Sequence, residues 1–202
     1  MVCSLVLQAK YQPSSNYMSR QTDINERMRA ILIDWLVEVH LKFKLEKDTL
    51  YLTVHLIDRL LELKAVKRQK LQLVGVTAML IASKYEEIYA PEIRDFVYIS
   101  DNAYTNDEIR AMETLMLNAF KFRITTPTIL SFINRYTKIM HADTTVQRLS
   151  QYYAESMLQE YSMLRYKPSL IAAAAIALAR KTVGKTAWVS MLVYYRSFAA
   201  SS

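Results

Sequence analysis

The sequence predicts an all-α fold made of two copies of one helical unit. Apolar residues recur at helical spacing along nearly the whole chain of 202 residues. Glycine occurs only at Gly75 and Gly184, and there are four prolines, too few for the turns of a β fold. No segment alternates apolar and polar residues convincingly, as a half-buried strand does.

Local start signals place the individual helices. Thr105 precedes an acidic first turn, which is typical of a capped helix. Pro91, Pro127 and Pro168 each stand where a helix is expected to begin. Together with the apolar periodicity, these signals predict helices over 25–43, 48–63, 68–87, 92–98, 105–120, 127–140, 145–163, 168–182 and 187–198.

An internal repeat divides the chain. A shift of 97 residues places Trp35 on Phe132 and Lys84 on Lys181, and it keeps core residue types in register. The first copy ends with the helix 105–120, whose counterpart would begin near residue 202. The second copy is therefore expected to lack its last helix.

Composition argues against catalysis and against a bound metal. Two distant glycines cannot build a phosphate-binding loop or a nucleophile elbow. Cys3 is the only cysteine, so there is neither a disulfide framework nor a thiolate metal site. The three histidines are far apart and lack ligands at suitable spacing. We therefore expect no catalytic residues, no metal and no other cofactor.

Neither a membrane nor a nucleic acid is the expected partner. The longest uncharged runs, 71–83 and 168–179, fall short of the roughly 20 residues that span a bilayer. The apolar start of the chain lacks the basic flank of a signal peptide. The net charge of +7 comes from basic residues interleaved with acids over several segments, which favours a solvated surface. Attraction to an acidic partner remains open.

The segment 28–39 is apolar on almost every side of a helix. Such a helix must be surrounded by protein, or it leaves an apolar stripe for a partner. Plain core is one interpretation of its Met28–Trp35 face. Glu38, at the edge of that face beside Trp35, favours a slot for a short peptide that carries a bulky apolar residue and an arginine.

Three charged residues fall on apolar faces. Arg29 lies among apolar residues and needs a carboxylate, for which Asp58 is the candidate in a structural ion pair. Lys84 and Glu113 also project from apolar surroundings. They either pair with each other inside the molecule or serve an intermolecular site ringed by Ile81, Tyr85, Leu117 and Phe122.

Several segments closely resemble the cyclin box of mitotic, B-type cyclins. They are Met28–Val39, the run KLQLVGVTAMLIASKYEEI at 70–88, PEIRDFVYI at 91–99 and DNAYT at 101–105. The similarity is strong from about Asp23 to Phe122 and continues more weakly to about Lys181. The resemblance implies two tandem five-helix cyclin boxes. The expected organisation is an N-terminal segment 1–22 holding a remnant of the family's N-terminal helix, a first box 23–122 and a second box 123–202.

The resemblance further implies a non-catalytic regulatory subunit that binds and activates a cyclin-dependent serine/threonine kinase, acting in the nucleus and cytoplasm. Two surfaces would carry this role. The residues that match the family's kinase contact are Lys84, Glu113, Ile81, Tyr85, Leu117, Phe122 and Ile124. Those that match its docking patch for Arg-x-Leu peptides of substrates and inhibitors are Met28, Ile31, Leu32, Trp35, Glu38, Arg68, Leu71 and Gln72.

Two other functions compete with this interpretation. One is a cyclin-box transcription factor of the general factor IIB type, which the net charge of +7 fits. Lys84, Glu113 and the apolar patch favour a kinase partner instead. The other is a truncated, non-activating cyclin paralogue that still binds substrates.

Overall fold

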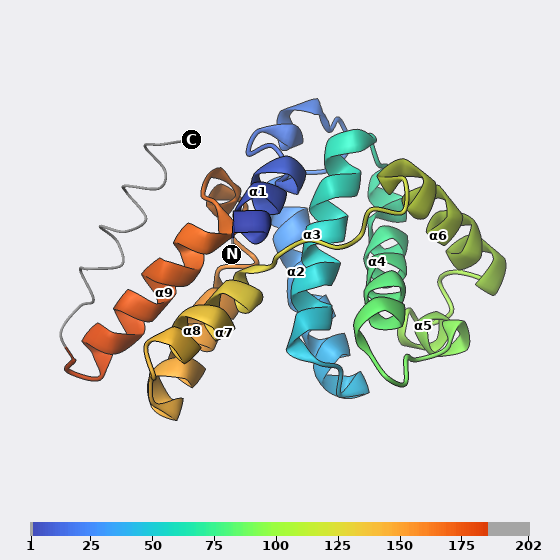
Figure 1. The fold of residues 1–202 in the computed structure, drawn as a ribbon. Helices are drawn as coiled ribbons and strands as arrows, with labels where there is room; N and C mark the ends of the chain where they lie inside the picture. The colour runs from blue at the N-terminus through green and yellow to red at the C-terminus, as the bar shows by residue number, and fades with distance from the viewer. Residues whose placement is uncertain (1, 186–202) are drawn as a thin grey trace.

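The computed structural model describes residues 2–185, and every regular element among them is helical. Two groups of helices lie side by side, with the N-terminal helix against the second group (Figure 1). The α-helices are α1 (Val2–Tyr11), α2 (Glu26–Phe43), α3 (Lys47–Leu63), α4 (Leu71–Glu86), α5 (Ile93–Ile99), α6 (Asn106–Phe120), α7 (Ile129–Ile139), α8 (Thr144–Ser156) and α9 (Pro168–Thr182). Short 3-10 helices are η1 (Tyr17–Arg20), η2 (Arg68–Lys70) and η3 (Tyr161–Arg165).

Helix α3 forms the centre of the first unit, between α2 and α4 (Figure 1). Its side chains are buried on nearly every side from Thr49 to Leu61. Helices α2 and α4 approach each other at Gly75. A Cβ atom added there would lie only 2.8 Å from Cδ1 of Leu32, so the missing side chain permits the close crossing.

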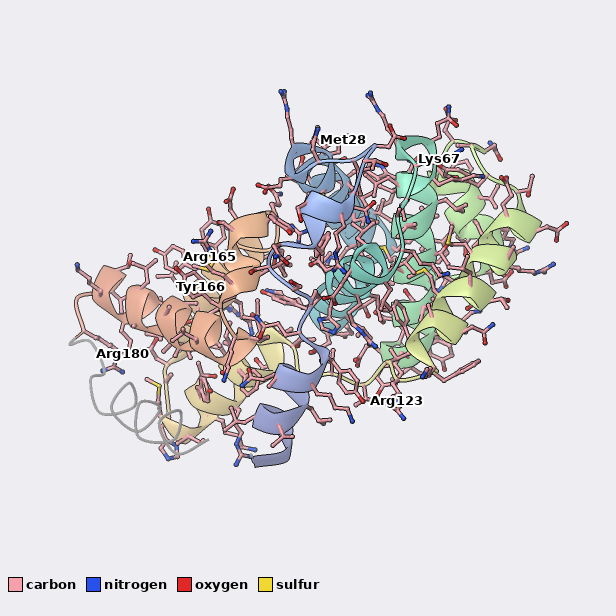
Figure 2. The ribbon with its side chains drawn as sticks, turned by 90° about the horizontal axis from the view of Figure 1, so that it is seen from above. Met28, Lys67, Arg123, Arg165, Tyr166 and Arg180 are labelled. Atoms are coloured by element: carbon pink, nitrogen blue, oxygen red, sulfur yellow. The ribbon has the colours of Figure 1, made fainter. Side chains whose placement is uncertain are left out.

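The second unit repeats the first. A shift of 97 residues moves α4, which begins at Leu71, onto α9, which begins at Pro168. It likewise overlays α2 on α7 and α3 on α8, so the predicted repeat is confirmed for these helices. Seen from above, Arg165, Tyr166 and Arg180 mark the second unit, and Met28 and Lys67 mark one edge of the first (Figure 2). The predicted helix 187–198 lies outside the described residues, and so does the region on which the prediction of an absent last helix depends.

The prediction of one continuous helix over 145–163 is wrong. Helix α8 ends at Ser156, and the separate 3-10 helix η3 follows. The reason lies on another helix. The Arg29 guanidinium donates to the carbonyl oxygens of Leu158 and Gln159, both at 3.1 Å, so these carbonyls serve Arg29 rather than a continuing helix.

Helix boundaries otherwise follow their caps. The side chain of Thr128 accepts a hydrogen bond from the Ser131 backbone N–H, so α7 begins at Ile129 and not at Pro127. Thr105 and Glu108 form the capping box of α6. The predicted helix 68–87 is divided into η2 and α4.

The N-terminal segment ties the two units together. Its helix α1 runs over ten residues. Gln8 accepts a hydrogen bond from the Ser169 backbone, and Gln12 donates to the carbonyl oxygens of Leu164 and Tyr166 in the second unit. Further along, Ser14 donates its backbone N–H to the Glu62 carboxylate on α3.

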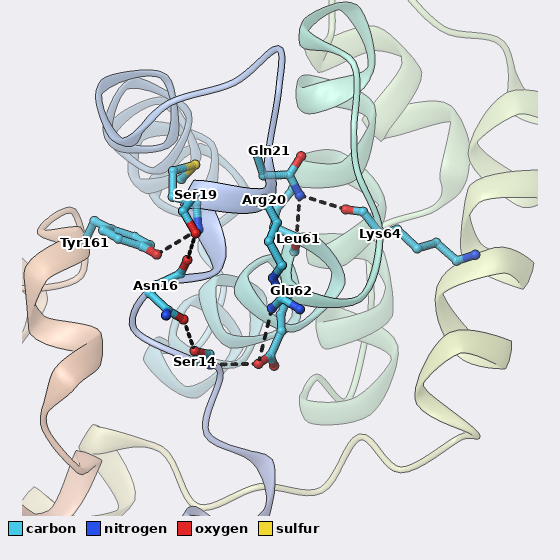
Figure 3. Close-up of polar contacts among 10 residues, drawn as sticks. Ser14, Asn16, Ser19, Arg20, Gln21, Leu61, Glu62, Lys64 and Tyr161 are labelled. Carbon is cyan, nitrogen blue, oxygen red and sulfur yellow. Dashed lines mark hydrogen bonds and ion pairs between the residues drawn. The ribbon is translucent and has the colours of Figure 1, made fainter.

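The rest of the segment runs along the end of α3. The Gln21 amide donates to the carbonyl oxygens of Leu61 and Lys64 (Figure 3). The backbone N–H of Met18 donates to the Tyr161 hydroxyl of η3 at 2.9 Å. The segment therefore touches both units along its length.

Candidate functional site

Lys84 and Glu113 meet at the surface of the first unit. Lys84 lies in the last turn of α4, and its Nζ is 2.7 Å from one carboxylate oxygen of Glu113 on α6 and 3.0 Å from the other. The two side chains are 48% and 16% exposed. Lys84 and Glu113 therefore do form the intramolecular ion pair that was one of the two predicted alternatives. The pair lies at the surface, where Lys84 remains accessible to a partner.

The residues expected to surround this pair divide into two groups. Tyr85 and Phe122 are exposed, and the Tyr85 hydroxyl lies 2.6 Å from the Thr125 hydroxyl. Leu117 and Ile124 are half-buried. Ile81 is buried in the core, so it supports the surface from below and presents almost no area to a partner.

Backbone geometry holds Phe122 outward. After α6 ends, Lys121 and Phe122 both have left-handed backbone conformations, with φ of 51° and 57°. The Phe122 N–H reaches back to the carbonyl oxygen of Leu117 at 2.9 Å and closes the helix end. Phe122 is 68% exposed. The left-handed backbone conformation is unfavourable for such a bulky residue, so the surrounding structure must hold it in place.

Sequence reasoning missed two further exposed apolar residues, which follow the helix of Lys84. Ile88 and Tyr89 follow α4 directly and are 90% and 92% exposed. Two adjacent large apolar side chains in open solvent are unusual and are typical of a contact surface. The available signal was their position within a loop four to five residues after Lys84.

The predicted docking patch comes from α2, between Met28 and Glu38, from Arg68 in η2 and from the first turn of α4. Ile31 is 60% exposed, whereas Leu32 and Leu71 are buried and present almost no area to a partner. Met28, Trp35 and Gln72 are half-buried, and Glu38 and Arg68 are exposed at the rim. Helices α2 and α4 pack against each other, so the predicted patch combines apolar residues of both helices with the exposed charges of Glu38 and Arg68.

Arg29 and Asp58 form a buried ion pair. Both side chains are 2% exposed, and the guanidinium donates twice to the carboxylate, at 2.6 and 2.7 Å. The Tyr17 hydroxyl donates to the same carboxylate at 2.7 Å. Because Arg29 also bonds to carbonyl oxygens of the second unit, this cluster joins α2, α3, η1 and the chain just before η3.

The pKa values in this cluster follow from burial and charge. Desolvation by itself lowers the pKa of Arg29, but the charge and hydrogen bonds of Asp58 together with Tyr17 outweigh it, and the net pKa is raised. Burial, followed by the Asp58 charge, raises the pKa of Tyr17. Arg29 therefore stays charged and Tyr17 stays neutral, as the hydrogen bonds require.

A cavity of about 80 Å³ lies where α1, α3, the linker at 126–129 and the second unit meet. His55 lines it, and burial lowers the pKa of this histidine to about 4. Within residues 2–185 no cluster of three or more His, Cys, Asp or Glu side chains could hold a metal ion. No helix in this part of the chain combines the length and the apolar character needed to cross a membrane.

The repeated helical units define a protein of two tandem all-α domains. The family models "Cyclin, N-terminal domain" and "Cyclin, C-terminal domain" match residues 2–125 and 127–202. The chain belongs to the cyclin family.

The predicted likeness to B-type mitotic cyclins is confirmed. The chain is 50% identical over 192 residues to "G2/mitotic-specific cyclin-B" of Spisula solidissima, covering 95% of this chain and 45% of that protein. It is 50% identical over 176 residues to "G2/mitotic-specific cyclin-B2" of Homo sapiens, covering 87% and 44%. It is 48% identical over 190 residues to "Cyclin-B1-3" of Oryza sativa subsp. japonica, covering 94% and 40%. The chain thus spans less than half the length of these relatives.

Solved structures share the fold. A viral cyclin from herpesvirus saimiri superposes with a TM-score of 0.78 at 22% identity, covering 90% of this chain and 79% of that one. A chain of the yeast RNA Pol II CTD kinase CTDK-1 complex superposes with a TM-score of 0.72 at 12% identity, covering 90% and 62%. At these identities the likeness is one of fold.

Proposed function

We propose that this protein is a regulatory subunit that binds and activates a cyclin-dependent serine/threonine kinase in mitotic control. The observation that carries the proposal is the surface pair of Lys84, which is 48% exposed, and Glu113, which is 16% exposed, beside exposed aromatic residues. The names of the relatives support the mitotic role, and one solved chain of the same fold belongs to a kinase complex.

The pair is suited to bind the backbone of a helix in a partner protein. Lys84 carries three N–H donors and Glu113 two acceptor oxygens, so both can bind backbone groups of a partner. Opening the intramolecular contact costs little, because an exposed ion pair contributes about 0–1 kcal/mol. The exposed rings of Tyr85 and Phe122 supply the apolar area next to these polar groups.

Activation would work through differential binding. The chain packs on a kinase helix in the active conformation, and this brings the kinase's own Lys–Glu ion pair together and orders its activation loop. A shift from 1:99 to 99:1 requires about 5.5 kcal/mol of preference for the active state. An interface of ordinary size with aromatic anchors can supply that amount. The phosphoryl-transfer chemistry stays on the kinase.

Substrate recruitment is the second part of the proposal. The patch around Ile31 and Trp35 would take the leucine of an Arg-x-Leu peptide, while Glu38 pairs with its arginine. Trp35→Ala is then expected to weaken binding of such a peptide more than binding of the kinase. Equal loss of both would indicate that the substitution has collapsed the core.

Co-purification tests the proposal directly. The chain is mixed with candidate cyclin-dependent kinases, the complexes are isolated, and phosphorylation of a substrate without a docking motif is measured. We expect a stable complex with one kinase and a phosphorylation rate far above that of the kinase alone. Failure to bind or activate any of these kinases would contradict the proposal.

A further inference from the structure

The charge of the exposed side chains changes from positive to negative along one ridge of α2. Arg27, Ile31 and Glu38 recur at the spacing that keeps residues on one side of a helix, with Asp34 on the same line. All four are exposed. The ridge therefore begins with a cation, carries the apolar Ile31 in the middle and ends with two carboxylates one turn apart.

The segment before α4 adds cations to the basic end. Arg68 donates its backbone N–H to the Asp23 carboxylate at 2.8 Å, and Val66 donates its own to the Gln21 side chain at 3.0 Å. These bonds hold the segment against the chain just before α2. Met28 and Lys67 accordingly lie along the same edge of the molecule in Figure 2.

Three cations at this end have no carboxylate within ion-pair distance among the described residues: Arg27, Lys67 and Arg68. Two neighbouring basic residues do have carboxylate partners: Lys70 pairs with Glu108 at 2.9 Å and Arg20 with Glu62 at 3.9 Å. Of the acids nearby, Asp23 is occupied by the Arg68 backbone. Glu26 precedes Arg27 by one residue, so it projects about 100° away from the ridge.

The other end of the ridge carries carboxylates, which attract a cation. Asp34 accepts one hydrogen bond from the Gln159 side chain at 2.8 Å, and Glu38 is exposed beyond it. A bound segment that carries a cation is attracted here and repelled from the basic end. Between the two ends Ile31 offers an exposed apolar side chain.

We infer that the docking patch selects Arg-x-Leu segments that carry an acidic or phosphorylated residue after the leucine. The inference rests on the proposed docking function. With the arginine at Glu38 and the leucine beside Ile31, the rest of the peptide runs toward Arg27, Lys67 and Arg68. The ridge from Glu38 to Arg27 is about 16 Å long at 1.5 Å per residue. An extended peptide covers that length in about five residues, so the anion belongs two or three positions after the leucine.

Fluorescence anisotropy with the full 202-residue chain tests the inference. Four labelled peptides share one Arg-x-Leu core. The first is neutral, the second carries glutamate three positions after the leucine, and the third carries phosphoserine at that same position. The fourth carries glutamate before the arginine. Two variants, Lys67→Gln and Arg27→Gln, remove cations outside the apolar patch. Lys138→Gln on α7 removes a matched exposed lysine far along the chain.

We expect glutamate after the leucine to tighten binding about threefold and phosphoserine about tenfold, with the gain falling at high salt. Glutamate before the arginine weakens binding. The combined Lys67→Gln/Arg27→Gln variant loses the gain but binds the neutral peptide normally, and Lys138→Gln retains the gain.

The outcomes separate the inference from the function on which it rests. If the neutral peptide binds but neither anion after the leucine tightens it, or if the gain survives in the combined variant, the inference is overturned and docking stands. If no Arg-x-Leu peptide binds at all, both the docking function and the inference fail.

Discussion

Two ion pairs of the first unit have similar chemistry and opposite surroundings. Arg29 and Asp58 are both 2% exposed and lie among further hydrogen-bond partners. Lys84 and Glu113 are 48% and 16% exposed, and their shortest contact of 2.7 Å is close to the 2.6 Å of the buried pair. The comparison shows that contact distance alone does not distinguish a structural pair from one available to a partner, whereas burial does.

The physical reason is the cost of removing a charge from water. At Arg29 every polar contact lies inside the protein, so loss of any partner leaves a buried charge unpaired. At Lys84 water replaces a lost partner, so the pair can open without loss of the fold. The first pair therefore fixes the junction of the two units, whereas the second contributes little to the stability of the fold.

The largest effect is expected at the buried pair. Arg29→Met leaves the Asp58 carboxylate buried without its cation, and the free energy of unfolding should fall by about 3–5 kcal/mol. Urea unfolding followed by circular dichroism measures the loss. A loss below about 1 kcal/mol would show that the pair does not hold the junction.

The histidine beside that junction should give the next largest effect. The pKa of His55 falls from its ordinary 6.5 to about 4 by burial and by the charge of Arg59. Because the folded pKa is depressed, its contribution to stability is present above pH 6.5 and is lost as the pH falls toward 4. At about 1.4 kcal/mol per pH unit this amounts to about 3 kcal/mol.

Urea unfolding between pH 7.5 and 4 checks this prediction. The wild-type chain should lose about 3 kcal/mol more over this interval than His55→Leu, which cannot titrate. His141→Asn, which removes an exposed histidine, should follow the wild type. An equal pH dependence of wild type and His55→Leu would contradict the depressed pKa.

The smallest effect on stability is expected at the exposed pair. Lys84→Met and Glu113→Gln should each change the free energy of unfolding by less than about 1 kcal/mol, since solvent screens the contact. A double-mutant cycle in urea measures the coupling, which we expect at about 0.2–1 kcal/mol. Coupling as large as that expected at Arg29 would remove the distinction between the two pairs.

The sequence alone predicts most of the helices, the second helical unit and the buried ion pair. Helix periodicity gives most elements, and the 97-residue shift gives the second unit from the first. The need of Arg29 for a carboxylate also identifies Asp58, because few acids lie on an apolar face. These inferences depend on residue type and spacing, which a single sequence contains.

Other features depend on neighbours that spacing does not reveal. The end of α8 at Ser156 involves carbonyl groups bound by Arg29, more than 120 residues away in the chain. Helical spacing placed Ile81 on the contact surface, but tertiary packing buries it. The exposed Ile88 and Tyr89 lie in an irregular loop, where periodicity carries no information.

The central claim is that Lys84 and Glu113 are held at the surface to bind a kinase. Its most direct test is activation of the cognate kinase by Lys84→Ala and Glu113→Ala. Lys70→Ala is the control, because Lys70 is as exposed as Lys84 and also pairs with a glutamate of α6, Glu108. We predict that both site variants unfold like the wild type but fail to activate the kinase, while Lys70→Ala activates it fully. Normal activation by either site variant would contradict the claim.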